Sequence, residues 1–152
     1  MPDRRPMLSD VLCDVLEKMA FMFGDEANAE VLPEPEEGYV QAHMTFTGPM
    51  AGSITMAVAG EMCPELAANI LGAEADDDRA LEKSRDALKE LLNITCGQIL
   101  TAIAGDEPVF DLSVPEASEM SPEDWNALAS RPDTTAVLAD DFPVLLSLQV
   151  DE

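Results

Sequence analysis

One long amphipathic segment, residues 79–104, limits the possible folds more than any other feature of this sequence. Apolar side chains recur along it every three or four residues, which is the spacing of one helix face. We expect a helix from about Arg79 to Ala104 that ends at Gly105, with the aspartates at 76–78 capping its start. An apolar face of this length must be covered by a sheet or by other helices. The residues expected on that face are Leu81, Leu88, Leu92, Thr95, Cys96, Ile99 and Ile103.

The other segments predict a second long helix and several strands. A helix is expected from about Asp10 to Phe23, ended by Gly24, and a shorter one from Glu61 to Leu71. Strands are expected at residues 40–46, 54–58, 109–114, 134–139 and 144–150, with a hairpin turn at 48–52. The stretch 116–133 is a polar excursion that holds one small helix capped by Ser121. This order predicts a single domain, residues 1–152, of the α+β class, with long helices on an antiparallel-rich sheet.

Charge and residue counts exclude several classes of function. Lys and Arg number 8 and Asp and Glu number 31, which gives a net charge of −23. A field of that sign repels phosphate backbones and anionic lipids, so nucleic-acid and membrane partners are not expected. A metal site and a His-dependent catalytic triad lack residues, because His43 is the single histidine and no CxxC pair is present. Cys13, Cys63 and Cys96 are expected to be buried, reduced thiols.

The sequence predicts a cytoplasmic protein. Arg4 and Arg5 resemble the start of an export signal, but charged residues from Asp10 onward interrupt the apolar stretch that should follow. The longest uncharged run, residues 38–60, contains polar side chains and a Gly48-Pro49 break, which disfavour a membrane-spanning helix.

A narrow polar row lies opposite the apolar face of the predicted helix 79–104. On a helical wheel the row consists of Asp86, Glu90, Asn93 and Gly97. Acidic residues on a solvated face need no special explanation. Asn93 and Gly97 are different, because asparagine is a poor helix former and glycine costs roughly 1 kcal/mol relative to alanine. Such local inconsistencies tend to mark functional surfaces.

The two predicted long helices are weakly similar to one another at an offset of 73 residues. Apolar positions coincide, as for Leu8 with Leu81, and Glu17 coincides with Glu90. Cys13 stands where Asp86 stands, and Ala20 where Asn93 stands. The chain therefore divides into two related halves, of which the second alone keeps the polar trio.

These residues resemble the signature of the CheC/CheX/FliY phosphatases of bacterial chemotaxis. The pattern is Asp86-x3-Glu90-x2-Asn93, followed after 21 residues by Pro115, whereas the family usually places its proline one residue further on. Segments 46–54 and 65–72 are also similar to that family. Because one helix carries the residues, the chain is most similar to the single-site CheX branch. The resemblance implies a CheX-like domain with pseudo-two-fold halves that forms a homodimer.

The resemblance also implies a phosphatase that hydrolyses the aspartyl phosphate of a CheY-like response regulator. In that case Asn93 orients the attacking water, and Glu90 pairs with a cation of the regulator. Asp86, Gly97 and Pro115 contact the partner. No cofactor or metal on this chain is implied, since the divalent metal is expected in the regulator's own phosphorylation site.

Two other classes of function stay open on the sequence. The chain could be a non-catalytic module that binds a response regulator or acts in a flagellar switch, in which case binding would not depend on Asn93. It could also be a structural homodimer subunit, in which case Asn93 and Gly97 would be accidental.

Overall fold

The computed structural model describes residues 3–29, 32–74 and 79–151. The aspartates at 76–78, expected to cap the long helix, lie outside these ranges. In chain order the elements are α1 (Arg5–Ala20), β1 (Gly24–Ala27), β2 (Tyr39–Thr47), β3 (Ala51–Ala59), the 3-10 helix η2 (Gly60–Met62), α2 (Cys63–Leu71), α3 (Ala80–Ala104), β4 (Asp111–Leu112), β5 (Glu116–Met120), α4 (Pro122–Ala129), β6 (Thr134–Ala139) and β7 (Phe142–Asp151).

The strands form one antiparallel sheet, as the sequence predicts. Their order is β1-β6-β7-β3-β2-β4, and β5 also pairs with β2. The central pair is β3 with β7, in a register that places Ile54 opposite Leu148 and Val58 opposite Val144. The predicted α+β class with an antiparallel-rich sheet is confirmed.

The sheet is built by two halves that exchange their edge strands. In each half a long helix precedes the strands, α1 before β1–β3 and α3 before β4–β7. The edge strand β1 of the first half pairs with β6 of the second, whereas β4 and β5 of the second half pair with β2 of the first. This reciprocal arrangement about the β3–β7 pair confirms the predicted pseudo-two-fold halves.

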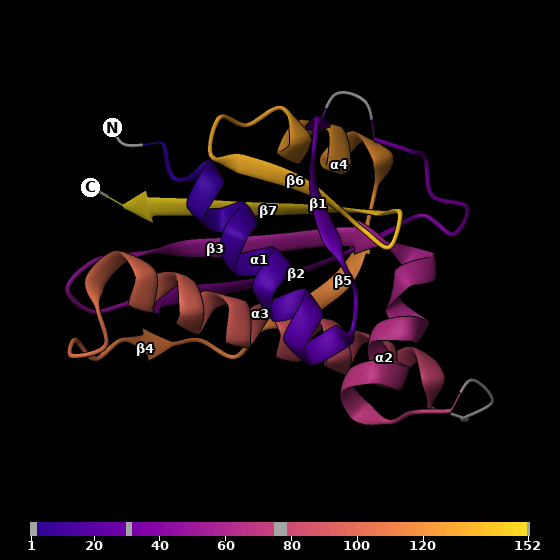
Figure 1. Ribbon diagram of the computed structural model, residues 1–152, viewed down its shortest axis with the longest axis horizontal. Coiled ribbons are helices and arrows are strands. Elements are labelled where there is room, and N and C mark those ends of the chain that lie inside the picture. The colour runs from indigo at the N-terminus through magenta and orange to yellow at the C-terminus, as the bar shows by residue number, and fades with distance from the viewer. Residues whose placement is uncertain (1–2, 30–31, 75–78, 152) are drawn as a thin grey trace.

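The two long helices α1 and α3 cover one face of the sheet (Figure 1). Fully buried side chains from both helices, such as Leu12 and Leu88, pack with Met44 and Met56 of the sheet in one large core cluster. The small helix α4 covers part of the opposite face, where Trp125 stacks on Tyr39 with ring centroids 4.2 Å apart. Burial of this apolar surface supplies the main stabilisation of the fold.

The first helix begins and ends earlier than predicted, at Arg5 and Ala20, and the strand after it was not predicted. Helix α1 ends at Ala20 because Phe21 adopts a left-handed conformation with φ 55°, and the Phe21 N–H donates to the Leu16 carbonyl. Gly24 therefore begins the edge strand β1 instead of ending the helix. Strand β1 pairs with β6 and has no buried residue, so no apolar alternation marks it in the sequence.

The segment between α3 and β6 also differs from the prediction. The strand expected at 109–114 is reduced to Asp111–Leu112. The stretch 116–133 is not only polar loop and helix, since β5 pairs with β2 there, with Glu116 opposite His43. The predicted small helix is present as α4, and the Ser121 hydroxyl accepts a hydrogen bond of 3.1 Å from the Asp124 N–H.

The cysteines are free thiols, but only two of the three are buried. Burial raises the pKa of Cys63 and of Cys96 to about 11. Cys13 is half-buried, which corrects the expectation that all three are in the core. Among the described residues, no helix is both long enough and apolar enough to cross a membrane.

Candidate functional site

Helix α3 carries the candidate site, and its buried face is largely the predicted one. Leu88, Leu92 and Ile99 have no exposed surface, and Thr95 and Cys96 are buried beside them. The prediction was wrong for Leu81, which is 67% exposed. Leu81 lies in the first turn of α3, where the helix borders an open cavity of about 420 Å³ instead of the sheet.

The polar row lies on the outer side of α3, opposite the buried face. Asp86 and Glu90 are exposed, and Asn93 and Gly97 are half-buried. These positions follow one another at three- and four-residue intervals, so their side chains project along one ridge of the helix. The structure thus brings together four of the five predicted site residues on one surface.

The Glu90 and Asn93 side chains are free to contact another molecule. Within the described residues neither makes a side-chain hydrogen bond or an ion pair. Asp86 is 3.8 Å from the Lys89 ammonium, and both side chains are more than a third exposed. An exposed pair of this kind contributes only about 0.2–1 kcal/mol, so it can be rearranged when a partner binds.

Gly97 is not required by the packing of this chain. A Cβ atom built at this position would meet no atom within 4 Å. Its φ lies outside the left-handed region, so a side chain would cause no backbone strain. Glycine in a helix interior nevertheless costs about 1 kcal/mol relative to alanine. No contact within this chain therefore explains why glycine occupies position 97. A second molecule that approaches the helix closely would explain it, because a side chain at this position would be in its way.

The chain from β4 to β5 runs beside this ridge (Figure 1). A cavity of about 160 Å³ separates Gly97 and Leu100 from Phe110 and Leu112 near one end of α3. Towards the other end, Arg85 Nη2 is 4.0 Å from Glu119 Oε1.

Pro115 lies between these two contacts along the chain, directly before β5. It is half-buried. The fifth predicted site residue is thus on the segment that flanks the row and not on α3 itself.

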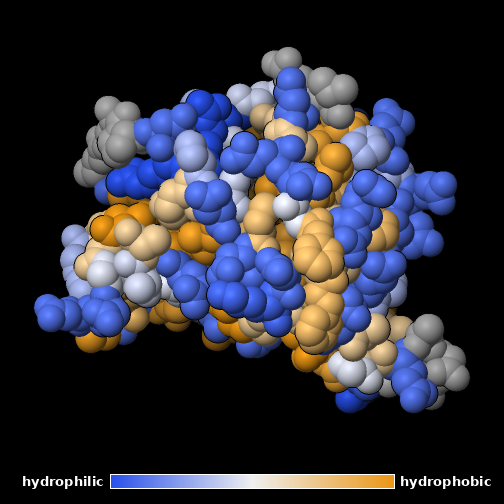
Figure 2. Space-filling model, viewed as in Figure 1, coloured by the Kyte–Doolittle hydropathy of each residue, from blue (hydrophilic) through white to orange (hydrophobic). Residues whose placement is uncertain are grey.

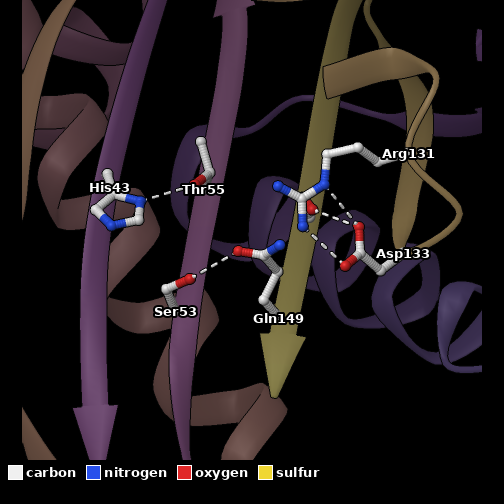
Figure 3. Close-up of polar contacts among 7 residues, drawn as sticks. His43, Ser53, Thr55, Arg131, Asp133 and Gln149 are labelled. Carbon is white, nitrogen blue, oxygen red and sulfur yellow. Dashed lines mark hydrogen bonds and ion pairs between the residues drawn. The ribbon is translucent and has the colours of Figure 1, made fainter. Parts of the chain in front are cut away.

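The opposite face of the sheet carries a separate set of polar contacts, remote from α3 (Figure 3). His43 Nδ1 is 2.8 Å from Thr55 Oγ1, and the Arg131 guanidinium donates two hydrogen bonds of 2.9 and 3.1 Å to the Asp133 carboxylate. Burial raises the pKa of Asp133, but hydrogen bonds from Arg131 and Ser147 outweigh it and leave the pKa below its usual value. These contacts link β2, β3, β7 and the loop before β6, and they involve no residue of the polar row.

The part of the chain that the structure describes contains no cluster of His, Cys, Asp or Glu arranged to hold a metal ion. What the α3 ridge offers instead is an uncompensated carboxylate, a neutral amide and an open glycine. The amide can orient a water molecule, and the carboxylate can accept hydrogen bonds from a cation. The bond to be broken would have to belong to another molecule that docks on the ridge.

The comparisons with known proteins agree with this architecture. An antiparallel sheet with two long helices on one face is the fold that this chain shares with solved CheX and FliY proteins. Residues 40–132, which include α3 and Pro115, match the family model for the chemotaxis phosphatase CheX. The chain therefore belongs to the CheX family.

Solved structures support the same fold. A chemotaxis protein CheX from Desulfovibrio desulfuricans is 15% identical, with a TM-score of 0.70 over 99% of this chain and 100% of that one. The CheX–CheY–BeF3–Mg2+ complex from Borrelia burgdorferi gives 18% identity and a TM-score of 0.68, over 99% and 100% of the two chains. FliY from Thermotoga maritima is 13% identical, with a TM-score of 0.53 over 97% and 91%. A search of curated proteins found no match.

Proposed function

We propose that this chain hydrolyses the aspartyl phosphate of a CheY-like response regulator. Membership of a chemotaxis phosphatase family supports this activity in general terms. The observation that carries the proposal is the α3 ridge, on which the Glu90 and Asn93 side chains project outward and make no hydrogen bond or ion pair with the described residues. The Borrelia burgdorferi structure, in which a protein of this fold is in complex with CheY, BeF3 and Mg2+, supports the choice of partner.

The proposed chemistry requires little from this chain beyond positioning. An aspartyl phosphate is a mixed anhydride, and hydrolysis needs a water placed in line with the departing acyl oxygen. In our proposal the Asn93 carboxamide oxygen accepts a hydrogen bond from that water, because an amide can orient a water without being titrated. The water attacks phosphorus, the P–O bond to the aspartyl oxygen breaks, and inorganic phosphate and the free carboxylate are formed.

Glu90 would act one turn away by pairing with a cation of the regulator. Its carboxylate is exposed and has no partner among the described residues, so the pairing costs no internal contact. Asp86, Gly97 and Pro115 would line the contact around it. The divalent metal of the reaction is proposed to belong to the regulator's phosphorylation site, and no step requires a group bound to this chain.

We further propose that the protein is a cytoplasmic homodimer. Strand β1 pairs with β6 on one side, and no pairing of its other edge is found within the described residues. An open strand edge can pair with a second copy of the chain. Light scattering coupled to gel filtration would distinguish the dimer from a monomer.

Decay of a phosphorylated receiver domain tests the proposed activity. We expect the wild-type chain to accelerate the decay and Asn93→Ala to lower kcat on the order of 10²-fold, because the water is no longer positioned. Glu90→Ala should weaken both docking and turnover. Gln98→Ala, at an exposed position of α3 outside the row, is the matched control and should behave as wild type.

The alternative, a non-catalytic binding module, predicts a different result. Wild type would then bind the receiver without changing its decay, and Asn93→Ala would bind equally well. That outcome would refute the phosphatase proposal.

A further inference from the structure

The segment that flanks the α3 ridge is held in a fixed conformation by this chain's own contacts. The Phe110 ring packs edge-on against Phe46, with centroids 6.1 Å apart. The Ser113 N–H donates to the Thr45 carbonyl at 2.9 Å, and the Thr45 N–H donates to the Ser113 hydroxyl at 2.8 Å. Between these anchors, β4 pairs with the end of β2. The backbone of residues 110–113 is therefore tied to the sheet along its length.

This fixed segment presents apolar side chains to solvent. Val109 is 82% exposed, Val114 is 83% exposed and Leu112 is 39% exposed. The two valines are the residues directly before and after this anchored backbone, so the anchors restrict where they lie. Their side chains are nevertheless almost fully exposed. Exposed apolar residues that are scattered singly need no explanation, but three within six positions concentrate exposed apolar surface on one held segment.

The held segment adjoins the surface of the polar row. The cavity between Gly97 and Leu112 joins the ridge to the flanking segment. In the space-filling view, apolar surface appears along the lower margin of the molecule, where Figure 1 places β4 (Figure 2). A molecule large enough to cover the ridge at Gly97 would therefore also reach Leu112 of this segment.

We propose that Val109, Leu112 and Val114, here termed the apolar strip, form the second half of the docking surface for the response regulator. This inference rests on the proposed function, since it assigns the strip to the same partner as Glu90 and Asn93. The partner expected to fit is a receiver domain with cationic groups in its phosphorylation pocket and an apolar patch on the surface beside that pocket. Contact with the strip holds the receiver in place while the ridge enters the pocket.

The area that a protein partner must cover indicates that the docking surface extends beyond the ridge. A specific protein interface buries about 800 Å² on each partner, which amounts to some 20–30 residues a side. The four residues of the polar row cannot supply that area alone, and the apolar strip is the adjoining surface. A rigid strip also loses little conformational entropy when a partner binds.

Charge argues against a second copy of this chain as the occupant. Pairing the strip with itself would bring the exposed Asp86 and Glu90 carboxylates of two ridges together, which pairing through β1 need not do. Like charges brought together oppose association, whereas a cationic pocket is attracted to the ridge.

The test uses Val109→Thr and Val114→Thr, singly and together. Threonine keeps the branched shape, and both sites are exposed, so the variants should fold as wild type. Leu71→Thr is the matched control, because Leu71 is 46% exposed at the end of α2, which lies far from β4 in Figure 1. Steady-state decay of a phosphorylated receiver gives kcat and KM for each variant.

We expect the double variant to raise KM about tenfold and to leave kcat unchanged, since it weakens docking without moving Asn93. Leu71→Thr should leave both constants unchanged. An unchanged KM in the double variant, together with the kcat loss of Asn93→Ala, would overturn this inference while the proposed function stands.

Failure of the proposed function gives a different pattern. If the wild-type chain accelerates the decay of no receiver, binding of beryllofluoride-treated receivers is measured instead by calorimetry. If the double variant then binds more weakly than wild type and Leu71→Thr does not, the docking surface is supported and the phosphatase activity is refuted. Equal binding by all variants, or no binding at all, would overturn the inference.

Discussion

Replacing Gly97 should make the protein more stable and less active, and the two effects have separate causes. A Cβ at this position meets no atom within 4 Å, so Gly97→Ala removes the flexibility of glycine without creating a clash. The helix propensity difference is about 1 kcal/mol, which is the expected gain in the free energy of unfolding. For a domain of this size that gain raises Tm by about 2–4 °C. Thermal denaturation followed by circular dichroism measures it.

Activity should move in the opposite direction. Gly97→Leu places a large side chain in the 160 Å³ cavity beside Leu112, where our proposal needs the regulator's backbone to approach. We expect kcat/KM for receiver dephosphorylation to fall on the order of tenfold, because a small displacement of the docked partner misplaces the water. The folded state should remain at least as stable as wild type.

Gly72 provides the contrast that tests the reasoning. A Cβ on Gly72 would also meet no atom within 4 Å, but the φ of 68° lies in the left-handed region, where this glycine ends α2. Gly72→Ala should therefore lower stability by about 1 kcal/mol. A loss of stability in Gly97→Ala, or full activity in Gly97→Leu, would refute the assignment of Gly97 as a contact position.

Three further predictions concern stability alone. Phe21 is 68% exposed with φ 55°, so Phe21→Gly should raise the free energy of unfolding by about 1 kcal/mol in urea denaturation, and a decrease would show that its ring packs usefully. The Thr134 hydroxyl is buried without a hydrogen-bond partner among the described residues, so Thr134→Val should be neutral or stabilising by about 1 kcal/mol in the same assay. The pKa of Asp133 is lowered in the folded state, so its contribution is present above the unfolded pKa and is lost as pH falls through the folded one. Asp133→Asn should therefore destabilise the protein at pH 7, and the difference from wild type should shrink as the pH falls below the usual pKa of aspartate, which a pH series of melting temperatures checks.

The elements that the sequence predicted well are those whose side chains face two environments. Helix α3 has an apolar face against the sheet and a polar face in solvent, so the sequence shows its periodicity. Its end could be predicted because Gly105 follows the last helical residue. The polar row followed from the same periodicity. Its recognition depended on Asn93 and Gly97, whose low helix propensity is a property of the residues themselves.

The elements that the sequence missed are edge strands. β1 and β5 each pair with one strand, and at least half of the residues in each are exposed, so neither has to alternate apolar and polar residues. The apolar strip was missed for a related reason. A strand was expected at 109–114, and in such a strand Val109 and Val114 would belong to opposite faces of the sheet, whereas the structure confines pairing to Asp111–Leu112 and exposes both valines.

The weak copy of the site on α1 differs from α3 in its surroundings as well as in its residues. Cys13, which corresponds to Asp86, lies against β1, since a Cβ on Gly24 would come within 2.8 Å of its sulfur. Ala20, which corresponds to Asn93, has no exposed surface, and the Asn69 side chain donates a 2.7 Å hydrogen bond to its carbonyl. The first half of the protein has thus covered the surface that the second half leaves open.

Restoring the residues on α1 should therefore not restore a site. Ala20→Asn would bury an amide where the structure provides no space for it, and we expect the free energy of unfolding to fall by about 1–3 kcal/mol. Cys13→Asp combined with Ala20→Asn should leave the rate of receiver dephosphorylation per folded chain no higher than wild type. Urea denaturation and the decay assay measure the two effects. A doubled rate with unchanged stability would show that α1 can still present the ridge, and that the covering by α2 and β1 is not what separates the two halves.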